Sequence, residues 1–350
     1  RKMVGHEMNK VTIKDIAELS GFSKATVSRA LNDSPRISEK TKKTINDFAK
    51  MLNYQPNPMA RALVHQKTQL IGYVMRNFKD AFHPVTNTLL QGITEEISKY
   101  NYNLVLLTPD YGEVDYDFDK VSQGFVDGLI VSPQETKPKD IIKLSEKNLP
   151  FVLINNYIPG ISNPCVRVDY NDICFRVIRH FYTLGHRRVA LINGQPEFRI
   201  SIDMLEGYKL ALTASNLQFE SELVVNGDYT EEESYKLMKI LLDLSEPPTA
   251  VFGEDYMVMG AMRAIKEAGL SIPEDMAVIG FNDVPLAASV TPPLSSVQVH
   301  MDRVGKHAVD MIISQIEGGA LSKQEVIIEG DLVIRASCGT TTNEMKSGVI

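Results

Sequence analysis

Hydroxyl and basic side chains between residues 23 and 29 have the chemistry that binds a polyanion. Ser23, Thr26 and Ser28 carry hydroxyl groups, and Lys24 and Arg29 carry positive charge. Hydroxyls bond to phosphate oxygens, and lysine and arginine bond both to phosphates and to the acceptor edge of guanine. These residue types suit contact with duplex DNA, provided that one rigid element presents them together.

A helix-turn-helix arrangement would present them in this way. Thr12 and Asp15 have the spacing of a capping box, which predicts a short amphipathic helix to about Ser20. Gly21 can take the positive φ that ends this helix, and a second helix is expected over 24–31. Helices joined by such a tight turn are typical of DNA-binding domains.

The second expected helix has an apolar and a polar arc. At 100° per residue the apolar arc holds Val27, Ala30 and Leu31, and the polar arc holds Lys24, Ala25, Ser28 and Arg29. Ser38 is expected to cap a third helix, in which apolar residues at 45, 48, 49 and 52 keep helical spacing. Any three-helix bundle would bury such apolar arcs, but it would not explain the basic polar arc that begins at the turn.

Charge is unevenly distributed along the 350 residues. The first 67 hold 13 Lys and Arg against 6 Asp and Glu, a net charge of +7, whereas the remainder holds 24 against 38, a net charge of −14. A short basic module on a large acidic body favours a polyanion-binding head whose body has another task. Chance clustering on a solvated face is the alternative that charge alone leaves open.

Several segments resemble the LacI/GalR family of bacterial repressors. VTIKDIA at 11–17 and SKATVSRALN at 23–32 are similar to its DNA-binding headpiece, and LNYQPNPMARAL at 52–63 is similar to its hinge helix. The resemblance implies that Lys24 and Ala25 read bases, that Arg29 contacts a base or phosphate, and that Leu63 is wedged into the minor groove, where an apolar side chain kinks the duplex. The DNA-binding residues expected in this way are Thr12, Ser23, Lys24, Ala25, Thr26, Ser28, Arg29, Asn32, Arg36, Tyr54, Asn57, Ala60 and Leu63.

From residue 69 onward, short apolar runs alternate with stretches of helical length. The expected strands are Leu70–Val74, Leu104–Leu107, Gly128–Val131, Phe151–Ile154, Arg188–Ile192, Thr249–Phe252 and Met276–Gly280. The expected helices include Thr86–Tyr100, Ile173–Leu184, Asp203–Ala214, Glu231–Leu242 and Val258–Ala268. This alternation predicts two doubly wound lobes of parallel sheet with a ligand cleft at the carboxyl ends of the strands. A TIM barrel is the competing architecture.

The family resemblance continues through this body, at DGLIV (127–131), LGHRRVALING (184–194) and VIGFND (278–283). It implies a core similar to periplasmic sugar-binding proteins. The expected fold class is α/β: a three-helix helix-turn-helix headpiece with a hinge helix, then a two-lobed core of two doubly wound parallel sheets. The expected domains are a headpiece at 11–55, hinge helix and linker at 56–68, a core at 69–340 and a tail at 341–350. Lobe 1 is expected at about 69–162 and 292–323, and lobe 2 at about 163–291 and 324–340, with crossings near Ser162, Thr291 and Lys323.

The expected effector cleft departs from the family pattern. Met204 stands where sugar-binding members carry an arginine, Glu254-Asp255 where they place Asn-Asp, and Asn282 where they have an aspartate. Arg76 or Arg199 could supply the missing cation. The expected effector-binding residues are Arg76, Phe82, Asn155, Met204, Glu254, Asp255 and Asn282.

Other features narrow the class of protein. The three cysteines form no CxxC pair, no apolar run approaches a membrane span, and residues 1–10 contain no apolar segment, so a cytoplasmic protein without metal or cofactor is expected. His186, between a helix-ending glycine and a strand, favours a structural hydrogen bond over catalysis. The tail at 339–350 has no leucine heptad, which favours a homodimer over a tetramer.

The expected function is therefore a non-enzymatic, sequence-specific transcriptional regulator that binds a near-palindromic operator. A repressor of carbohydrate uptake or catabolism genes, controlled by a sugar or sugar phosphate, fits the resemblance best. Two alternatives use the same core: a solute-binding protein, and an enzyme acting on sugars or nucleotides. The first would have no use for residues 11–64, and the sequence contains no GxGxxG, GxxxxGK[ST], HExxH or GxSxG motif for the second.

Overall fold

The computed structural model describes residues 11–55, 67–75, 82–108, 125–132, 138–147, 149–158, 163–321 and 323–339. The chain divides into two compact units between Gln69 and Leu70. We call the first unit the headpiece and the second the core. Most of the expected hinge, 56–66, and the tail from residue 340 onward lie outside the described residues.

The headpiece contains the three predicted helices, α1 (Ile13–Ser20), α2 (Lys24–Leu31) and α3 (Glu39–Met51). The backbone N–H of Thr12 donates to Asp15 Oδ2 at 2.7 Å, and Gly21 ends α1 at φ 73°. The Ser23 hydroxyl accepts from Thr26 N at 3.1 Å and the Ser38 hydroxyl from Thr41 N at 3.2 Å, so each helix begins at a predicted cap. A small apolar core joins the helices, formed by Ile16, Ala17, Val27, Ala30, Ile45 and Ala49.

The core contains two six-stranded sheets. Sheet A has the order β11-β5-β4-β3-β1-β2, and all of its pairs are parallel. Its strands are β1 (Leu70–Val74), β2 (Asn103–Leu107), β3 (Gly128–Val131), β4 (Phe151–Ile154), β5 (Cys165–Val168) and β11 (Glu325–Ile328). Sheet B has the order β12-β10-β9-β8-β6-β7. Its strands are β6 (Val189–Asn193), β7 (Val224–Asn226), β8 (Ala250–Gly253), β9 (Ala277–Phe281), β10 (Ser295–Gln298) and β12 (Asp331–Val333), and β12 is antiparallel to β10.

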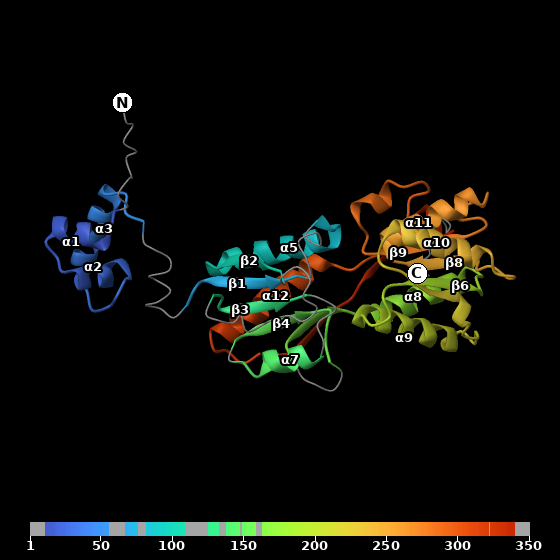
Figure 1. The fold of residues 1–350 in the computed structure, drawn as a ribbon, viewed down its shortest axis with the longest axis horizontal. Helices are drawn as coiled ribbons and strands as arrows, with labels where there is room; N and C mark the ends of the chain where they lie inside the picture. Colours follow the sequence, from blue (N-terminus) through green and yellow to red (C-terminus); the bar gives the residue numbers. More distant parts are fainter. Residues whose placement is uncertain are drawn as a thin grey trace, which may run out of the picture. The chain divides into compact units, whose positions relative to one another are not determined.

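Helices cover both faces of each sheet, as a doubly wound fold requires (Figure 1). On sheet A, α5 (Pro84–Ile97) and α12 (Met301–Ile316) pack together on one face, and α7 (Pro138–Ser145) lies on the other. On sheet B, α8 (Tyr170–Thr183) packs with α9 (Arg199–Ala214), and α10 (Glu231–Leu242) packs with α11 (Asp255–Glu267) on the opposite face. The TIM barrel alternative is thereby excluded.

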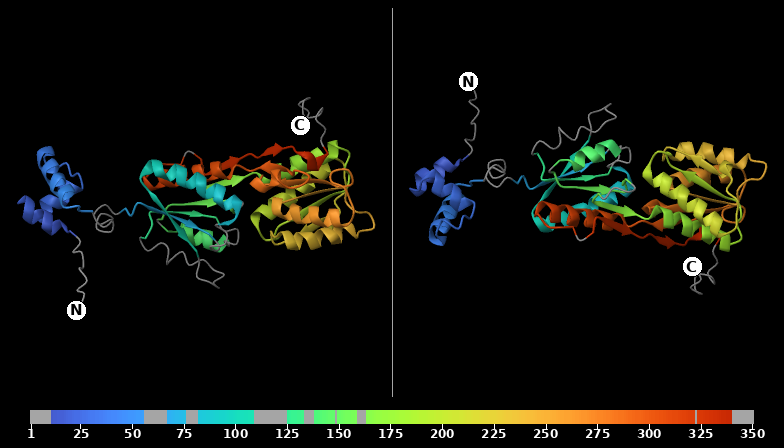
Figure 2. Two further views of the ribbon diagram at one scale, coloured as in Figure 1. Left: turned by 90° about the horizontal axis from the view of Figure 1, so that it is seen from above. Right: turned by 90° about the horizontal axis from the view of Figure 1, so that it is seen from below.

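The connections between the lobes differ from the prediction. Near Ser162, Thr291 and Lys323 the chain has not yet left the lobe it occupies, because β5, β10 and β11 still follow there. The crossings come after Val168, Gln298 and Ile328 instead. Figure 2 shows the C-terminal part of the core, drawn in red, passing between the lobes. The predicted boundaries came too early because the sequence analysis predicted none of these three strands; SSVQ in β10, for example, contains a single apolar residue.

Candidate functional site

The polar arc of α2 lies on the surface of the headpiece. Lys24, Ala25 and Arg29 are exposed, whereas Val27 and Ala30 on the opposite arc are 0% and 2% exposed. The helix therefore keeps two cations and a methyl group available while its apolar arc holds it to α1 and α3. An α-helix presented in this way fits the major groove of B-form DNA.

Other headpiece candidates have structural partners as well. The Ser23 and Thr26 hydroxyls lie 2.9 Å apart at the start of α2, and Asn32 Nδ2 donates to the Ser28 carbonyl at its end. Arg36 is exposed in the loop before α3, and Tyr54 is half-buried against the headpiece core. Asn57, Ala60 and Leu63 lie outside the described residues. DNA contact by all of these side chains stays a prediction.

In the core, polar side chains gather where the parallel strands end. Asn155 follows β4, Asn193 closes β6, Glu254 follows β8 and Asn282 follows β9. The carboxyl ends of parallel strands are the usual place for a ligand in open α/β sheets. We call this region of the two lobes the cleft. Arg76, a predicted cleft cation that follows β1, lies outside the described residues.

Glu254 is the cap of α11 rather than an open ligand group. Its side chain is 3% exposed, Oε2 accepts from Tyr256 N at 2.8 Å and from Met257 N at 3.3 Å, and Oε1 accepts from Asn282 Nδ2 at 2.9 Å. Burial raises the pKa of Glu254 to about 7, against the lowering effect of these three donors. Glu254 and Asn282 therefore bind each other.

Asp255 and Met204 lie in the interior, not on the cleft surface as the sequence predicted. Asp255 is 0% exposed and accepts from Val284 N at 2.8 Å and from the Ser296 hydroxyl at 2.6 Å. Burial raises its pKa, and the neighbouring Glu254 raises it further. Met204 is 1% exposed within the apolar core, because its position on α9 faces inward.

Two further predicted effector residues differ strongly in burial. Asn155 is 7% exposed at the lobe crossing, where Oδ1 accepts from Val168 N at 2.8 Å and thereby ties the end of β4 to the end of β5. Phe82, just before α5, is 70% exposed. Asn155 holds the crossing together, whereas Phe82 is mostly exposed.

Sequence reasoning missed an aromatic pair beside the cleft residues. Phe198 and Tyr229 stack with centroids 6.2 Å apart and planes 13° apart, and the Tyr229 and Ser201 hydroxyls lie 3.3 Å apart. Tyr229 has φ 64°, a left-handed conformation that a bulky residue rarely adopts. The available signal was position, since Tyr229 follows the short strand β7 that the sequence analysis did not predict.

A second missed group joins the lobes. Tyr157, which follows β4, and Arg167 of β5 belong to lobe 1, whereas Arg199 and Asp203 lie on α9 of lobe 2. Arg199 Nε donates to Asp203 Oδ1 at 2.8 Å, and the Tyr157 hydroxyl donates to the same oxygen at 3.2 Å. Arg199, named from sequence as a candidate cleft cation, is thus already paired. Alternation of apolar residues cannot reveal such a contact between distant segments.

The remaining reactive groups have structural roles. His186 Nδ1 and the Thr249 hydroxyl lie 2.9 Å apart, which confirms the predicted structural hydrogen bond. Cys165, Cys174 and Cys338 are buried, and burial raises the pKa of Cys165 to about 12. Across the described ranges, no cluster of His, Cys, Asp or Glu is arranged to hold a metal ion, and no helix has the length and apolar character to span a membrane.

Comparison with known proteins agrees with both units. Residues 12–57 match the model of the lacI family of bacterial regulatory proteins, and residues 178–338 match that of the periplasmic binding protein-like domain. The probable HTH-type transcriptional repressor ExuR of Bacillus subtilis is 34% identical over 330 residues, which cover 93% of this chain and 98% of the relative. The transcriptional repressor CytR of Escherichia coli is 29% identical and covers 93% of this chain and 96% of the relative.

Solved structures give the same result. A lac repressor dimer bound to operator and the anti-inducer ONPF has a TM-score of 0.84 at 25% identity, covering 94% of this chain and 99% of that one. The transcriptional regulator CelR in complex with cellobiose has a TM-score of 0.72 at 26% identity, covering 93% and 99%. With a three-helix headpiece, a two-lobed core and full-length relatives all in agreement, this chain belongs to the lacI family of bacterial regulatory proteins.

Proposed function

We propose that the chain is a cytoplasmic transcriptional repressor that binds a near-palindromic operator as a homodimer and is controlled by a small carbohydrate effector in the cleft. The single observation that carries the proposal is the exposed Lys24-Ala25-Arg29 arc of α2 on a headpiece whose helices begin at their predicted caps. A two-fold dimer requires a DNA site with two similar halves. The lac repressor relative is a dimer on its operator, which supports this assembly.

The proposed control links the cleft to the headpiece. An effector that binds one arrangement of the two lobes more tightly shifts the population of that arrangement, and a coupling of ~1–3 kcal/mol is typical. The CelR relative is in complex with cellobiose, which supports a carbohydrate as the class of effector. Genes of carbohydrate uptake or catabolism are the proposed targets.

Selection of bound duplexes from a random library tests the DNA-binding part. We expect full-length protein to enrich a sequence with two-fold symmetry, and Arg29→Ala to lose that enrichment. Enrichment of an asymmetric sequence, or of none, would contradict the proposal. Thermal melting of the full-length protein with sugars, sugar phosphates and nucleobases tests the cleft, because a ligand of the folded state raises the melting temperature.

A further inference from the structure

We propose that Tyr157, Arg199 and Asp203 form an interlobe latch that holds the two lobes of the core in the arrangement seen here. The inference concerns the equilibrium between arrangements of the lobes, so it holds whether or not the headpiece binds DNA. Tyr157 is the lobe 1 member, and Arg199 and Asp203 are the lobe 2 members.

One oxygen of Asp203 receives hydrogen bonds from both lobes. The Tyr157 hydroxyl donates to Asp203 Oδ1 at 3.2 Å across the junction, and Arg199 Nε donates to the same atom at 2.8 Å within α9. Asp203 is 5% exposed, although it is charged and lies at the junction of the lobes. Asp203 therefore accepts a hydrogen bond from the Tyr157 hydroxyl only while the two lobes stay together.

The ring of Tyr157 makes a second kind of contact across the junction. The Arg199 guanidinium carbon lies 5.0 Å from the ring centroid, and that of Arg167, from the tyrosine's own lobe, also lies 5.0 Å away. A cation within about 6 Å of an aromatic face is attracted to it. Arg167 Nε donates to Glu325 Oε1 of β11 at 2.6 Å. The lobe 1 arginine that contacts the Tyr157 ring is therefore itself held in place.

An open pocket beside the latch has walls from both lobes. Its volume is about 300 Å³, and Tyr157 and Arg167 line it from lobe 1, with Asn171, Phe175 and Asp203 among those lining it from lobe 2. Separation of the lobes would widen this space and expose the Asp203 carboxylate to water. Opening of the lobes would therefore break the hydrogen bond between Tyr157 and Asp203, and the free energy of that bond opposes the opening.

Further contacts join the lobes elsewhere. Asn155 Nδ2, at the end of β4, donates to the Tyr170 hydroxyl of α8 at 3.4 Å. His83, the cap of α5 in lobe 1, meets Tyr256 of α11 in lobe 2 edge to face at a centroid distance of 5.5 Å. α9 and α11 cover opposite faces of sheet B, as Figure 1 shows, so the two contacts lie on different sides of lobe 2. A hydrogen bond to a buried carboxylate exceeds an edge-on ring contact in strength, so the Tyr157 contact should resist opening more than the His83 contact does.

The chain offers a matched control for this tyrosine. The Tyr100 hydroxyl donates to Asp310 Oδ1 at 3.1 Å, and both residues belong to lobe 1, since α12 packs against α5. Tyr100→Phe removes the same kind of hydrogen bond as Tyr157→Phe but leaves the lobe junction unchanged. A role of Tyr157 in stability alone would make the two variants behave alike.

Single-molecule energy transfer between dyes on the two lobes of the full-length protein tests the latch. Ile142 on α7 and Leu210 on α9 are 42% and 53% exposed, so Ile142→Cys and Leu210→Cys would accept dyes, whereas the native cysteines are no more than 1% exposed. We expect Tyr157→Phe to raise the ratio of open to closed molecules about tenfold or more, the factor for one lost hydrogen bond to a charged group. Tyr157→Ala, which also loses the ring contacts, should raise the ratio further.

Tyr100→Phe should leave the distribution of energy transfer unchanged. The proposal is overturned if neither Tyr157 variant changes the distribution, or if Tyr100→Phe changes it as much as Tyr157→Phe does. Thermal melting of each variant shows that it is folded before its distribution is measured, and the conservative Tyr157→Phe keeps the test available if Tyr157→Ala does not fold.

Discussion

The buried carboxylate of Glu254 predicts a specific dependence of stability on pH. Burial raises the pKa of Glu254 from 4.5 to about 7 in the folded chain. Between these two values the folded chain holds a proton that the unfolded chain has lost. The contribution of Glu254 to the free energy of unfolding should therefore be highest below about pH 4.5, fall as the pH rises through this window and level off above about 7.

The size of the effect follows from the shift. One pKa unit corresponds to ~1.4 kcal/mol, so a shift from 4.5 to about 7 corresponds to ~3 kcal/mol. Glu254→Gln has no charge to titrate, and its side-chain oxygen can still accept from Tyr256 N at the start of α11. Asp255 titrates in both proteins, but the variant lacks the Glu254 charge that raises the pKa of Asp255, and this change acts in the same direction as the loss of the Glu254 titration.

Denaturant unfolding of parent and variant at several pH values between 4.5 and 8 measures this difference. The stability of Glu254→Gln relative to the parent should rise by ~3 kcal/mol across that range. Glu246→Gln, the same chemical change at an exposed position, should show no such rise. Parallel curves for the parent and Glu254→Gln would refute the reasoning, because Glu254 would then titrate alike in the folded and unfolded chain.

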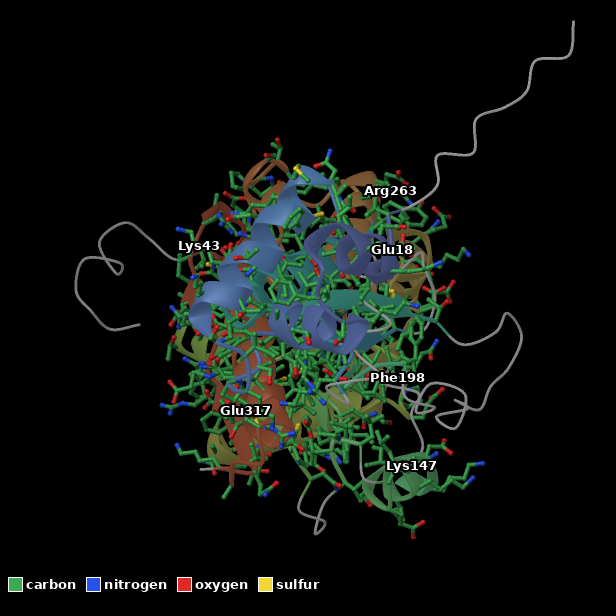
Figure 3. All side chains as sticks on the ribbon, turned by 90° about the vertical axis from the view of Figure 1, so that its left-hand side faces the viewer. Glu18, Lys43, Lys147, Phe198, Arg263 and Glu317 are labelled. Atoms are coloured by element: carbon green, nitrogen blue, oxygen red, sulfur yellow. The ribbon has the colours of Figure 1, made fainter. Side chains whose placement is uncertain are left out.

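Three further changes test other parts of the account. Ser38→Ala removes the cap of α3 and should destabilise the headpiece by ~1 kcal/mol in hydrogen exchange; unchanged protection of α3 would contradict this. Gly207→Ala should lower the melting temperature of the core by several degrees, since a Cβ there would overlap the Asn171 carbonyl oxygen of α8, and an unchanged value would show that α9 can shift freely. Arg29→Ala should weaken operator binding ~10-fold or more at unchanged melting temperature, whereas loss of folding would give Arg29 a structural role. Lys43→Ala, which removes one exposed charge from α3 (Figure 3), should weaken operator binding far less than Arg29→Ala does.

The headpiece was predictable from sequence because its signals are local. Capping residues such as Thr12 and Ser38, the turn at Gly21 and the apolar arc of α2 each act within a few residues, and the structure places helix ends where these signals predict them. The buried apolar strands were predictable for a similar reason. β1, β3 and β4 have the predicted bounds, since a run of buried apolar residues marks a strand covered on both faces.

The lobe boundaries were less predictable because they depend on pairing between distant segments. β5 joins sheet A through β4 and β11, and nothing within the sequence CVRV shows which sheet it enters. β12 is antiparallel and only three residues long, below the length at which alternation is informative. The prediction therefore had two lobes and three crossings, but each crossing was several residues too early.

Contacts between distant segments also limited the prediction of the cleft, and more strongly. The sequence drew attention to the strand ends that carry Glu254 and Asn282, but residue type alone could not show that the two side chains bind each other. Met204 was chosen because of its place in a motif, and it lies in the apolar core. Tyr157 and Asp203 are 46 positions apart, and only the fold brings them together.

The central claim is that the basic headpiece recognises a symmetric DNA site. The most direct test is the affinity of full-length protein for the duplex enriched by selection and for a scrambled duplex of equal length, measured over a range of salt concentrations. We expect the enriched duplex to bind at least ~1,000-fold more tightly. Both affinities should fall steeply as salt rises if, as proposed, the headpiece contacts several phosphates. Equal affinity for the two duplexes at every salt concentration would contradict the claim.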